Sequence, residues 1–208
     1  MKKYFFISIV FTLILFPAAV LFAGDDQVVE FGMKAGVNGF WGSGSDIDGS
    51  DGSYLSVGFT GGGFADYVPV KYFDIEFDIM FTWFNYGIKV SNPLYDKIKL
   101  RYGTMELPML FKGRLPAGNG AFYAGAGPDF IIVLGNGQVI TGDARRSFQV
   151  DQVFHIGLTA SLGYEWYIPG GTNAYVEARY VRGFDSPLDD NPIYPNRIDI
   201  LVGWSADL

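Results

Sequence analysis

The stretch Phe73-Asp74-Ile75-Glu76-Phe77-Asp78-Ile79-Met80-Phe81-Thr82-Trp83 decides the fold of this chain. Its odd positions are all large and apolar, whereas most of its even positions are acidic or polar. A side-chain period of two predicts a β-strand with one apolar face and one acidic face. In a water-soluble sheet, a second layer would cover the apolar face. In a membrane barrel, that face would meet lipid and the acids would line the inside.

The N-terminal segment has the pattern of a secretory signal peptide. A basic start is followed by a long apolar run, and Ala23 is the last small residue before a polar stretch. We therefore expect residues 1–23 to be a cleaved signal peptide and residues 24–208 to form one barrel domain. The alternative for the first segment is an uncleaved anchor helix.

Composition excludes several classes of protein. No helix-length apolar run follows residue 24, which argues against a helical membrane protein. The chain has no cysteine and therefore no disulfide or thiolate metal site. Without Lys2 and Lys3 it carries 13 basic and 22 acidic residues, and this net negative charge argues against a nucleic-acid partner. The 28 glycines and 17% aromatic content are typical of strands, tight turns and interfacial aromatics.

Eight segments share the two-residue period, and longer connections (42–52, 87–98, 135–149 and 185–196) alternate with shorter ones. A phase change around Leu100 and Tyr102 predicts a bulge near Gly103. About 11 residues, rising roughly 3.3 Å each at a tilt of about 40°, span the apolar band of an outer membrane. These features predict an all-β fold, an eight-stranded antiparallel up-and-down transmembrane β-barrel with both chain ends in the periplasm. The expected strands cover about 28–41, 54–67, 73–86, 99–114, 121–134, 150–167, 173–184 and 197–208.

A secreted lipocalin-like carrier of small ligands is the soluble alternative, because it is also an eight-stranded barrel, with its apolar face turned inward. The polar faces here hold mostly Gly, Ser, Thr and a few charges, which suits a narrow lumen better than a solvated surface. Large aromatic residues near the strand ends are expected to form an interfacial girdle: Trp41, Tyr67, Trp83, Trp166 and Trp204.

Two segments carry a resemblance to a known family. Residues 102–112, Tyr-Gly-Thr-Met-Glu-Leu-Pro-Met-Leu-Phe-Lys, look like a PorT-like strand. Residues 200–208 are similar to the C-terminal signal read by the barrel-assembly machinery, with Leu208 where that signal most often ends in Phe. The chain thus resembles the small eight-stranded outer-membrane β-barrel proteins, such as the OmpA transmembrane domain, OmpX and the PorT-like families. The resemblance implies a bacterial outer-membrane location, with membrane lipid and the assembly machinery as partners.

The polar strand faces would place many charged side chains in the lumen. Buried charges need partners, so a plug of ion pairs is the expected structure. Acids outnumber bases in this set, and the alternative is therefore a narrow cation-preferring pore. The expected lumen residues are Glu30, Lys34, Asp74, Glu76, Asp78, Glu106, Lys112, His155, Glu165, Glu177, Arg179, Asp199 and Asp207.

No catalytic site, metal site or cofactor is expected. His155 is the only histidine, and Ser161 and Glu165 would lie roughly 20 and 33 Å away along the same strand. The acidic loop at residues 46–52 lacks the Glu that an EF-hand needs at its twelfth position, where Val57 stands. We expect a monomer with a structural or surface-interaction role through its long loops, and an extracellular partner that the residues do not identify.

Overall fold

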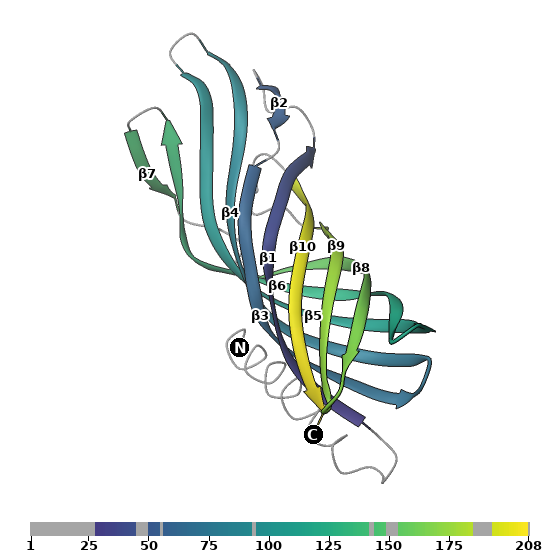
Figure 1. Ribbon diagram of the computed structural model, residues 1–208. Helices are drawn as coiled ribbons and strands as arrows, with labels where there is room; N and C mark the ends of the chain where they lie inside the picture. Colours follow the sequence, from purple (N-terminus) through teal and green to yellow (C-terminus); the bar gives the residue numbers. More distant parts are fainter. Residues whose placement is uncertain are drawn as a thin grey trace.

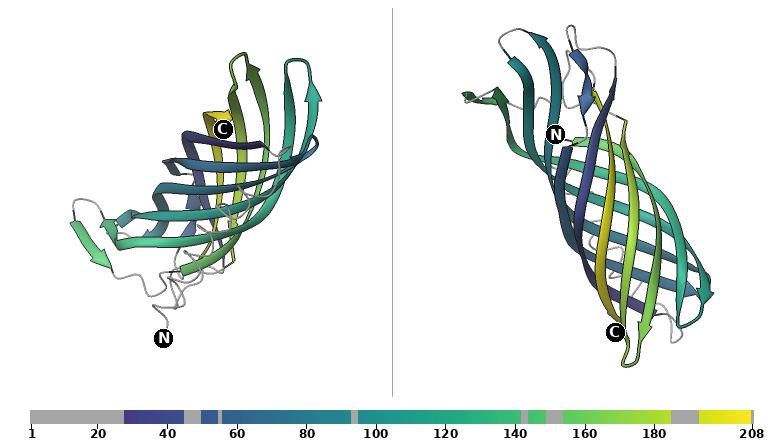
Figure 2. Two further views of the ribbon diagram at one scale, coloured as in Figure 1. Left: turned by 90° about the horizontal axis from the view of Figure 1, so that it is seen from below. Right: turned by 45° about the horizontal axis from the view of Figure 1, so that its top comes forward.

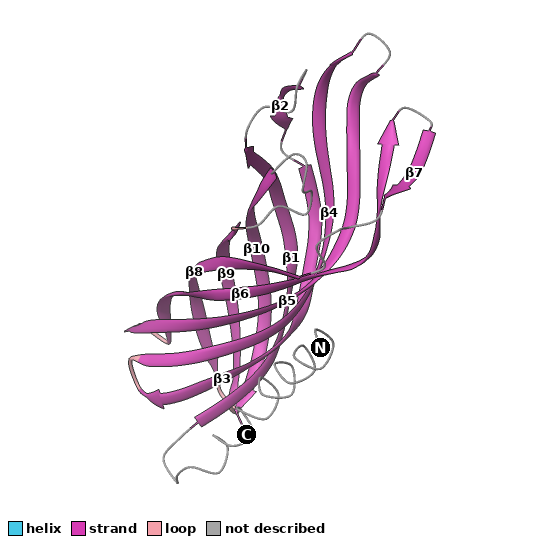
Figure 3. Ribbon diagram, turned by 180° about the vertical axis from the view of Figure 1, so that it is seen from behind, coloured by secondary structure: helices cyan, strands magenta, loops and turns pink. Residues whose placement is uncertain are grey.

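The computed structural model describes residues 28–44, 50–54, 56–92, 95–141, 144–148, 154–184 and 193–207, and all its regular elements there are antiparallel strands (Figures 1 and 3). Two short strands, β2 (Ser50–Tyr54) and β7 (Ala144–Phe148), pair with β4 (Phe73–Asn92) and β6 (Gly120–Thr141). No helix among the described residues is long and apolar enough to cross a membrane. The wall of the barrel consists of β1 (Val28–Gly44), β3 (Ser56–Val70), β4 (Phe73–Asn92), β5 (Tyr95–Ala117), β6 (Gly120–Thr141), β8 (Phe154–Ile168), β9 (Thr172–Gly183) and β10 (Ile193–Asp207).

These eight strands form a closed ring in which each strand pairs with its neighbours in the chain. The first and last strands close it, with Glu30 opposite Asp207 at one end and Gly44 opposite Ile193 at the other. Figure 2 shows the tilted strands of this wall from two sides. The predicted eight-stranded antiparallel up-and-down barrel, closed between its first and last strands, is confirmed.

The two faces of each strand separate apolar from polar side chains as the period of two predicts. On β4, Ile79 and Trp83 point outward and are 47% and 61% exposed, whereas Asp74, Glu76 and Asp78 are buried inside. Apolar side chains cover the outer face of the other strands in the same way. The lipocalin alternative is therefore wrong, because its apolar face would have to point into the barrel.

Three short turns define what we call the lower end of the barrel, at residues 71–72, 118–119 and 169–171. Gly118, Gly170 and Gly171 adopt positive φ angles of 62°, 110° and 76°, which side-chain-bearing residues rarely adopt. The three short connections predicted for this end of the barrel are confirmed by these turns.

The strands extend further at the upper end than the sequence pattern predicts. β4 continues to Asn92 and β5 starts at Tyr95, so most of the expected connection at 87–98 is a paired hairpin. The expected loop at 135–149 likewise contains the end of β6 and all of β7, and the one at 42–52 contains the end of β1 and the start of β2. On this upper part of β4 the two-residue alternation continues with its parity reversed, in Phe84, Tyr86, Ile88 and Val90. The upper ends of β4, β5, β6 and β7 stand away from the barrel in Figure 1.

The predicted bulge near Gly103 is placed on the wrong strand. β5 pairs with β4 in an unbroken register around Gly103. The register between β5 and β6 shifts at this level, because Tyr102 alone stands opposite residues 135–137 between the pairs Arg101–Gln138 and Gly103–Leu134. The extra residues belong to β6, and the phase change on β5 marks only the end of the lipid-facing alternation.

Three aromatic side chains lie flat against glycines of the neighbouring strand inside the barrel. Phe64 stands directly opposite Gly32, Tyr123 opposite Gly163, and Tyr175 opposite Gly203. A Cβ atom on any of these glycines would come within 2.5 Å of an atom of the facing ring. The small residue on one strand thus makes room for the ring of the next, which fills the lower lumen without overpacking.

Candidate functional site in the lumen

The charged residues predicted for the lumen point inward wherever the structure describes their side chains. Each of the eleven acids, lysines and arginines expected there, apart from Asp207, is at most 6% exposed. The side chain of Asp207 lies outside the described residues. The eleven are Glu30, Lys34, Asp74, Glu76, Asp78, Glu106, Lys112, Glu165, Glu177, Arg179 and Asp199.

Four residues of the lumen charge set are missing from the prediction, and they complete it. Asp66 on β3 and Asp129 on β6 are 3% and 0% exposed, and Arg114 on β5 and Arg197 on β10 are also buried. Each has the parity of the inward residues of its own strand and lies within an expected strand, so the two-residue period applied to the full length of these strands would have found all four.

The charges form two groups. The lower cluster comprises Glu30, Lys34, Asp66, Asp74, Glu76, Asp78, Lys112, Arg114, Glu165, Glu177 and Arg179. The upper cluster comprises Glu106, Asp129, Arg197 and Asp199.

Glu76 is the centre of the lower cluster. Lys34 Nζ donates to its Oε1 at 2.6 Å, and Lys112 Nζ donates to its Oε2 at 3.1 Å. Arg179 Nη2 lies 3.2 Å from Oε1 as a third cation. Lys112 also donates to Asp66 Oδ2 at 2.5 Å. The carboxylate of Glu76 thus connects bases from β1, β5 and β9.

Arg179 connects opposite walls of the barrel. Its Nη1 donates to Asp78 Oδ2 at 2.6 Å, and its Nε donates to Glu177 Oε1 at 2.7 Å. Asp78 lies on β4 and Arg179 on β9, which are four strands apart in the ring of eight. This ion pair therefore crosses the full width of the lumen.

Arg197 makes the same kind of connection in the upper cluster. Its Nη1 and Nη2 donate to the two carboxylate oxygens of Glu106, both at 2.6 Å, and its Nε lies 2.6 Å from Asp199 Oδ1. Such a bidentate pair is among the strongest polar contacts in proteins. β10 and β5 are again four strands apart in the ring, so this pair also spans the lumen.

Buried apolar side chains also occupy the lumen. Met80, Leu110 and Leu201 point inward and are 2%, 0% and 0% exposed. Leu110 stands on β5 between Glu106 of the upper cluster and Lys112 of the lower cluster. The lumen is thus filled by two charged clusters and by apolar side chains beside them.

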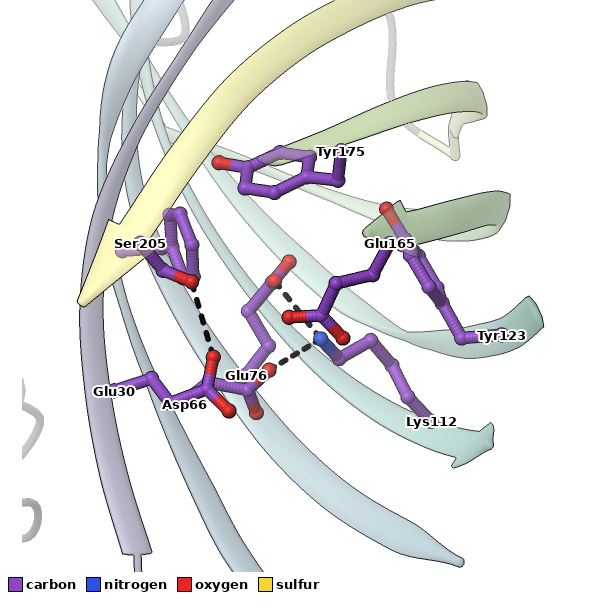
Figure 4. A pocket seen from close by; sticks show the side chains of 9 residues that line it. Glu30, Asp66, Glu76, Lys112, Tyr123, Glu165, Tyr175 and Ser205 are labelled. Carbon is purple, nitrogen blue, oxygen red and sulfur yellow. Dashed lines mark hydrogen bonds and ion pairs between the residues drawn. The ribbon is translucent and has the colours of Figure 1, made fainter. Parts of the chain in front are cut away.

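The lower cluster surrounds a small cavity (Figure 4). Four acids and one lysine line it together with three rings and a hydroxyl: Glu30, Asp66, Glu76, Glu165, Lys112, Phe64, Tyr123, Tyr175 and Ser205. The space open to the centre of a water-sized sphere is about 10 Å³, which is room for about one water molecule. The rings stand close to the lysines, with Lys34 Nζ 4.5 Å from the Phe64 ring centroid and Lys112 Nζ 5.0 Å from that of Tyr123. We call this space the lower cavity.

The expected interfacial aromatics lie at two levels of the outer wall. Trp166 and Trp204 are outward and partly exposed near the lower end, where both are paired with Ala174. Trp83 is outward on β4 toward the upper end. Tyr67 is half-buried near the lower end. The side chain of Trp41 lies outside the described residues.

The residues considered for chemistry are buried on one strand. His155, Ser161 and Glu165 all face inward on β8, six and ten residues apart. Within the part of the chain that the structure describes, no three acidic or imidazole groups are arranged to hold a metal ion. The acidic loop at 46–52 lies mostly outside the described residues.

Known proteins share this architecture. The family model described as outer membrane protein beta-barrel domain matches residues 24–188. Among solved structures, the outer membrane protein OprG from Pseudomonas aeruginosa is similar with a TM-score of 0.59 and 14% identity, over 88% of this chain and 97% of that one. Neisserial surface protein A (NspA) matches with a TM-score of 0.47 and 16% identity, over 83% and 95% of the two chains. No curated protein sequence matches the chain.

The family match covers most of the chain, and the OprG likeness shows the same fold. The exposed apolar wall and the closed ring of strands agree with both findings. The chain therefore belongs to the outer membrane protein β-barrel domain family and is a β-barrel protein of the bacterial outer membrane.

Proposed function

We propose that this protein is a closed barrel, with its lumen plugged by ion pairs, that acts at the cell surface through the upper ends of its strands. The observation that carries the proposal is the pair of arginine bridges across the lumen, Arg179 to Asp78 and Arg197 to Glu106. Each joins strands on opposite sides of the ring and so closes the lumen at its own level. Met80, Leu110 and Leu201, which are buried and point inward, support the same conclusion.

A surface role is supported by the shape of the upper end. The β4–β5 hairpin and the upper parts of β6 and β7 extend beyond the barrel (Figures 1 and 2). Paired strands hold a backbone in a defined conformation, which lowers the entropy cost of binding a partner. The proposed partner is an extracellular molecule or surface, and the barrel holds the upper ends of the strands in a fixed position for it.

The proposal includes the manner of insertion. The outward apolar wall binds outer-membrane lipid, and the alternating residues of β10 serve as the signal for the barrel-assembly machinery. The closed ring leaves no unpaired strand edge among the eight wall strands, which favours a monomer. We propose no catalytic role, because Ser161 and Glu165 stand far along β8 from His155.

A narrow cation-preferring pore is the second candidate, and one observation favours it. The buried charges of the described residues comprise ten acids and five lysines or arginines. An excess of acids in a lumen attracts cations.

Single-channel recording on the protein in planar bilayers distinguishes the two. The plugged barrel predicts no stable conductance, whereas the pore predicts long-lived openings that pass potassium more readily than chloride. Stable cation-selective openings of the unmodified protein would overturn the closed lumen. A porin with a known open channel serves as the positive control for insertion.

A further inference from the structure

Basic residues gather on the strands that rise above the barrel. The chain has 13 lysines and arginines after residue 23, and five of them are buried in the lumen. Six of the other eight belong to the upper parts of β4, β5 and β7, which are joined through β6 into one sheet (Figure 1). The six are Lys89, Lys97, Lys99, Arg101, Arg145 and Arg146. A chain with a net charge of -7 thus concentrates the bases outside its lumen at one end.

The strand register places five of these six residues on one face of the sheet. Residues that stand opposite each other on paired strands share a face, as do residues two apart along a strand. Lys97, Lys99 and Arg101 alternate along β5, and Lys97 stands opposite Lys89 of β4. Lys99 and Arg145 stand opposite one and the same residue of β6. We call these five residues the basic face.

The basic face holds no acid on β4, β5, β6 or β7. In the described stretches 85–92, 95–101, 138–140 and 145–147, the other residues of this face are Asn, Gly, Ser, Tyr, Gln and Ile. Asp96 is the one acid in these stretches, and it stands next to Lys97 and therefore on the opposite face. Lys89 and Lys97 stand directly opposite each other, which destabilises a pair of strands. An anion bound between the two lysines would remove this repulsion.

The basic face continues the lipid-facing side of the barrel wall. Trp83 points outward, is 61% exposed and stands opposite Gly103 of β5. Arg101 is the next residue of that side on β5, is also exposed, and lies about 7 Å further up the strand. Lys99 and Lys97 follow at the same spacing. The basic face thus begins just above an outward tryptophan, at the level where lipid headgroups meet the end of an apolar wall.

We propose that the basic face binds the phosphate groups of a phosphorylated glycolipid in the outer leaflet, beside the barrel. The inference rests on the proposed function, which puts the upper ends of the strands at the cell surface. Lysine and arginine bind phosphate through charge-assisted hydrogen bonds, and several bases next to a membrane surface add their attractions for anionic lipid. A bound headgroup would hold the sheet of β4 to β7 at the membrane surface.

A soluble polyanion outside the cell fits the position of these bases less well. It would meet the tip of the β4–β5 hairpin first. Three of the five residues of the basic face, Arg101, Lys99 and Arg145, lie instead at or below the level of Lys99, toward the membrane. This position favours a ligand that is itself part of the membrane.

The experiment measures lipid binding to the folded protein in detergent micelles by native mass spectrometry, which counts the bound molecules. Lipid A with both of its phosphates is titrated, and the same lipid without phosphates is the comparison. We expect saturable binding that is about tenfold tighter for the phosphorylated form, because the acyl chains are the same in both. Inorganic pyrophosphate and a heparin oligosaccharide are added as free anions. Neither is expected to displace the lipid at equal concentration.

Matched double variants localise the effect. Lys99→Gln combined with Arg101→Gln removes two bases of the basic face and should weaken the binding of phosphorylated lipid A by roughly 10- to 30-fold. Lys71→Gln combined with Arg146→Gln changes the net charge equally and should leave the affinity unchanged. Lys71 is exposed at the lower end of the barrel, and Arg146 is on the opposite face of the upper sheet. Heat-modifiable gel mobility confirms that both variants are folded, and the comparison of the two lipids needs no variant.

Three results would overturn the inference. Equal affinity for lipid A with and without phosphates would mean that the acyl chains alone hold it. Equal losses in the two double variants would mean that net charge acts and not the basic face. Displacement of the lipid by pyrophosphate or heparin at equal concentration would assign the face to a free anion.

A separate measurement tests the location on which the inference rests. Asn92→Cys puts a single cysteine at the end of β4 in a chain that has none. A membrane-impermeant maleimide should label this variant on intact cells. Labelling without selectivity for phosphorylated lipid A would reject the inference and leave the surface location standing, whereas absence of labelling would reject the surface role itself.

Discussion

Neighbouring residues on β4 face two different environments, the lipid outside and the lumen inside. Ile79 is 47% exposed on the lipid side, whereas Asp78 is 3% exposed in the lumen. Ile79→Lys would put a charge into the apolar band at a cost of about 2–4 kcal/mol. Asp78→Asn keeps an oxygen that accepts from Arg179 and removes one excess acid, so we expect a cost below about 1 kcal/mol.

Urea unfolding in lipid vesicles measures both changes, with Ile79→Leu as the control for the outer face. A larger loss for Asp78→Asn than for Ile79→Lys would contradict the assignment of the two faces.

Arg197 is the only lysine or arginine of the upper cluster. Its removal in Arg197→Gln leaves Glu106, Asp129 and Asp199 without a base, and truncating one side of a buried pair costs about 3–5 kcal/mol. Arg182→Gln is the matched control, because Arg182 is exposed on the outer face of β9 and should change stability by at most about 0.5 kcal/mol. Equal unfolding midpoints of the two variants in urea would show that the Glu106 bridge contributes nothing.

At the scale of the strands, each pair of an aromatic ring and a facing glycine determines how closely the two neighbouring strands can approach. A Cβ at Gly203 would lie 2.3 Å from both the Tyr175 hydroxyl oxygen and the Met33 carbonyl oxygen. We expect Gly203→Ala to destabilise the barrel by about 1–3 kcal/mol through overpacking. Gly63→Ala is the control, because its nearest atom would be 3.5 Å away on the outer face. The unfolding free energy in urea compares them, and a neutral Gly203→Ala would mean that the ring moves aside freely.

The upper hairpin of β4 and β5 is separable from the barrel. Lys89 pairs with Lys97, so an Asn-Gly turn in place of residues 90–96 joins two residues that already face each other. We expect the shortened protein to fold and to keep its heat-modifiable gel mobility, because the wall pairs below Trp83 are unchanged. Loss of the folded band would show that the hairpin tip is needed for assembly.

At the scale of the whole molecule, the proposed closure rests on two arginine bridges, Arg179 to Asp78 and Arg197 to Glu106. Replacing both Arg179 and Arg197 by Gln removes the two contacts that cross the lumen and leaves more uncompensated acids. We expect brief cation-selective openings in planar bilayers that the unmodified protein lacks. Heat-modifiable migration confirms that the double variant is folded. A folded but silent double variant would assign closure to Met80, Leu110 and Leu201.

The two-residue period predicted most of the fold because it is visible within each single strand, although it arises from the closed barrel as a whole. In a membrane barrel, side chains that face lipid are apolar. The alternation on β4 can therefore be recognised from the sequence of that strand alone. The same parity places Asp66 and Arg197 in the lumen. The end of the strand was misplaced because the alternation on β4 reverses its parity at Phe84 and then continues into the hairpin with β5.

The sequence by itself determined that this protein is a barrel, which side of each strand meets lipid, and that acids exceed bases inside. Only the tertiary structure decided which charges meet. Arg179 and Asp78 are 101 residues apart in the chain, and their contact depends on the closed ring that sets β9 opposite β4. The acidic face of residues 73–83 can thus be recognised from the sequence alone. Which lysines and arginines neutralise these acids depends on how the eight strands are staggered around the narrow lumen.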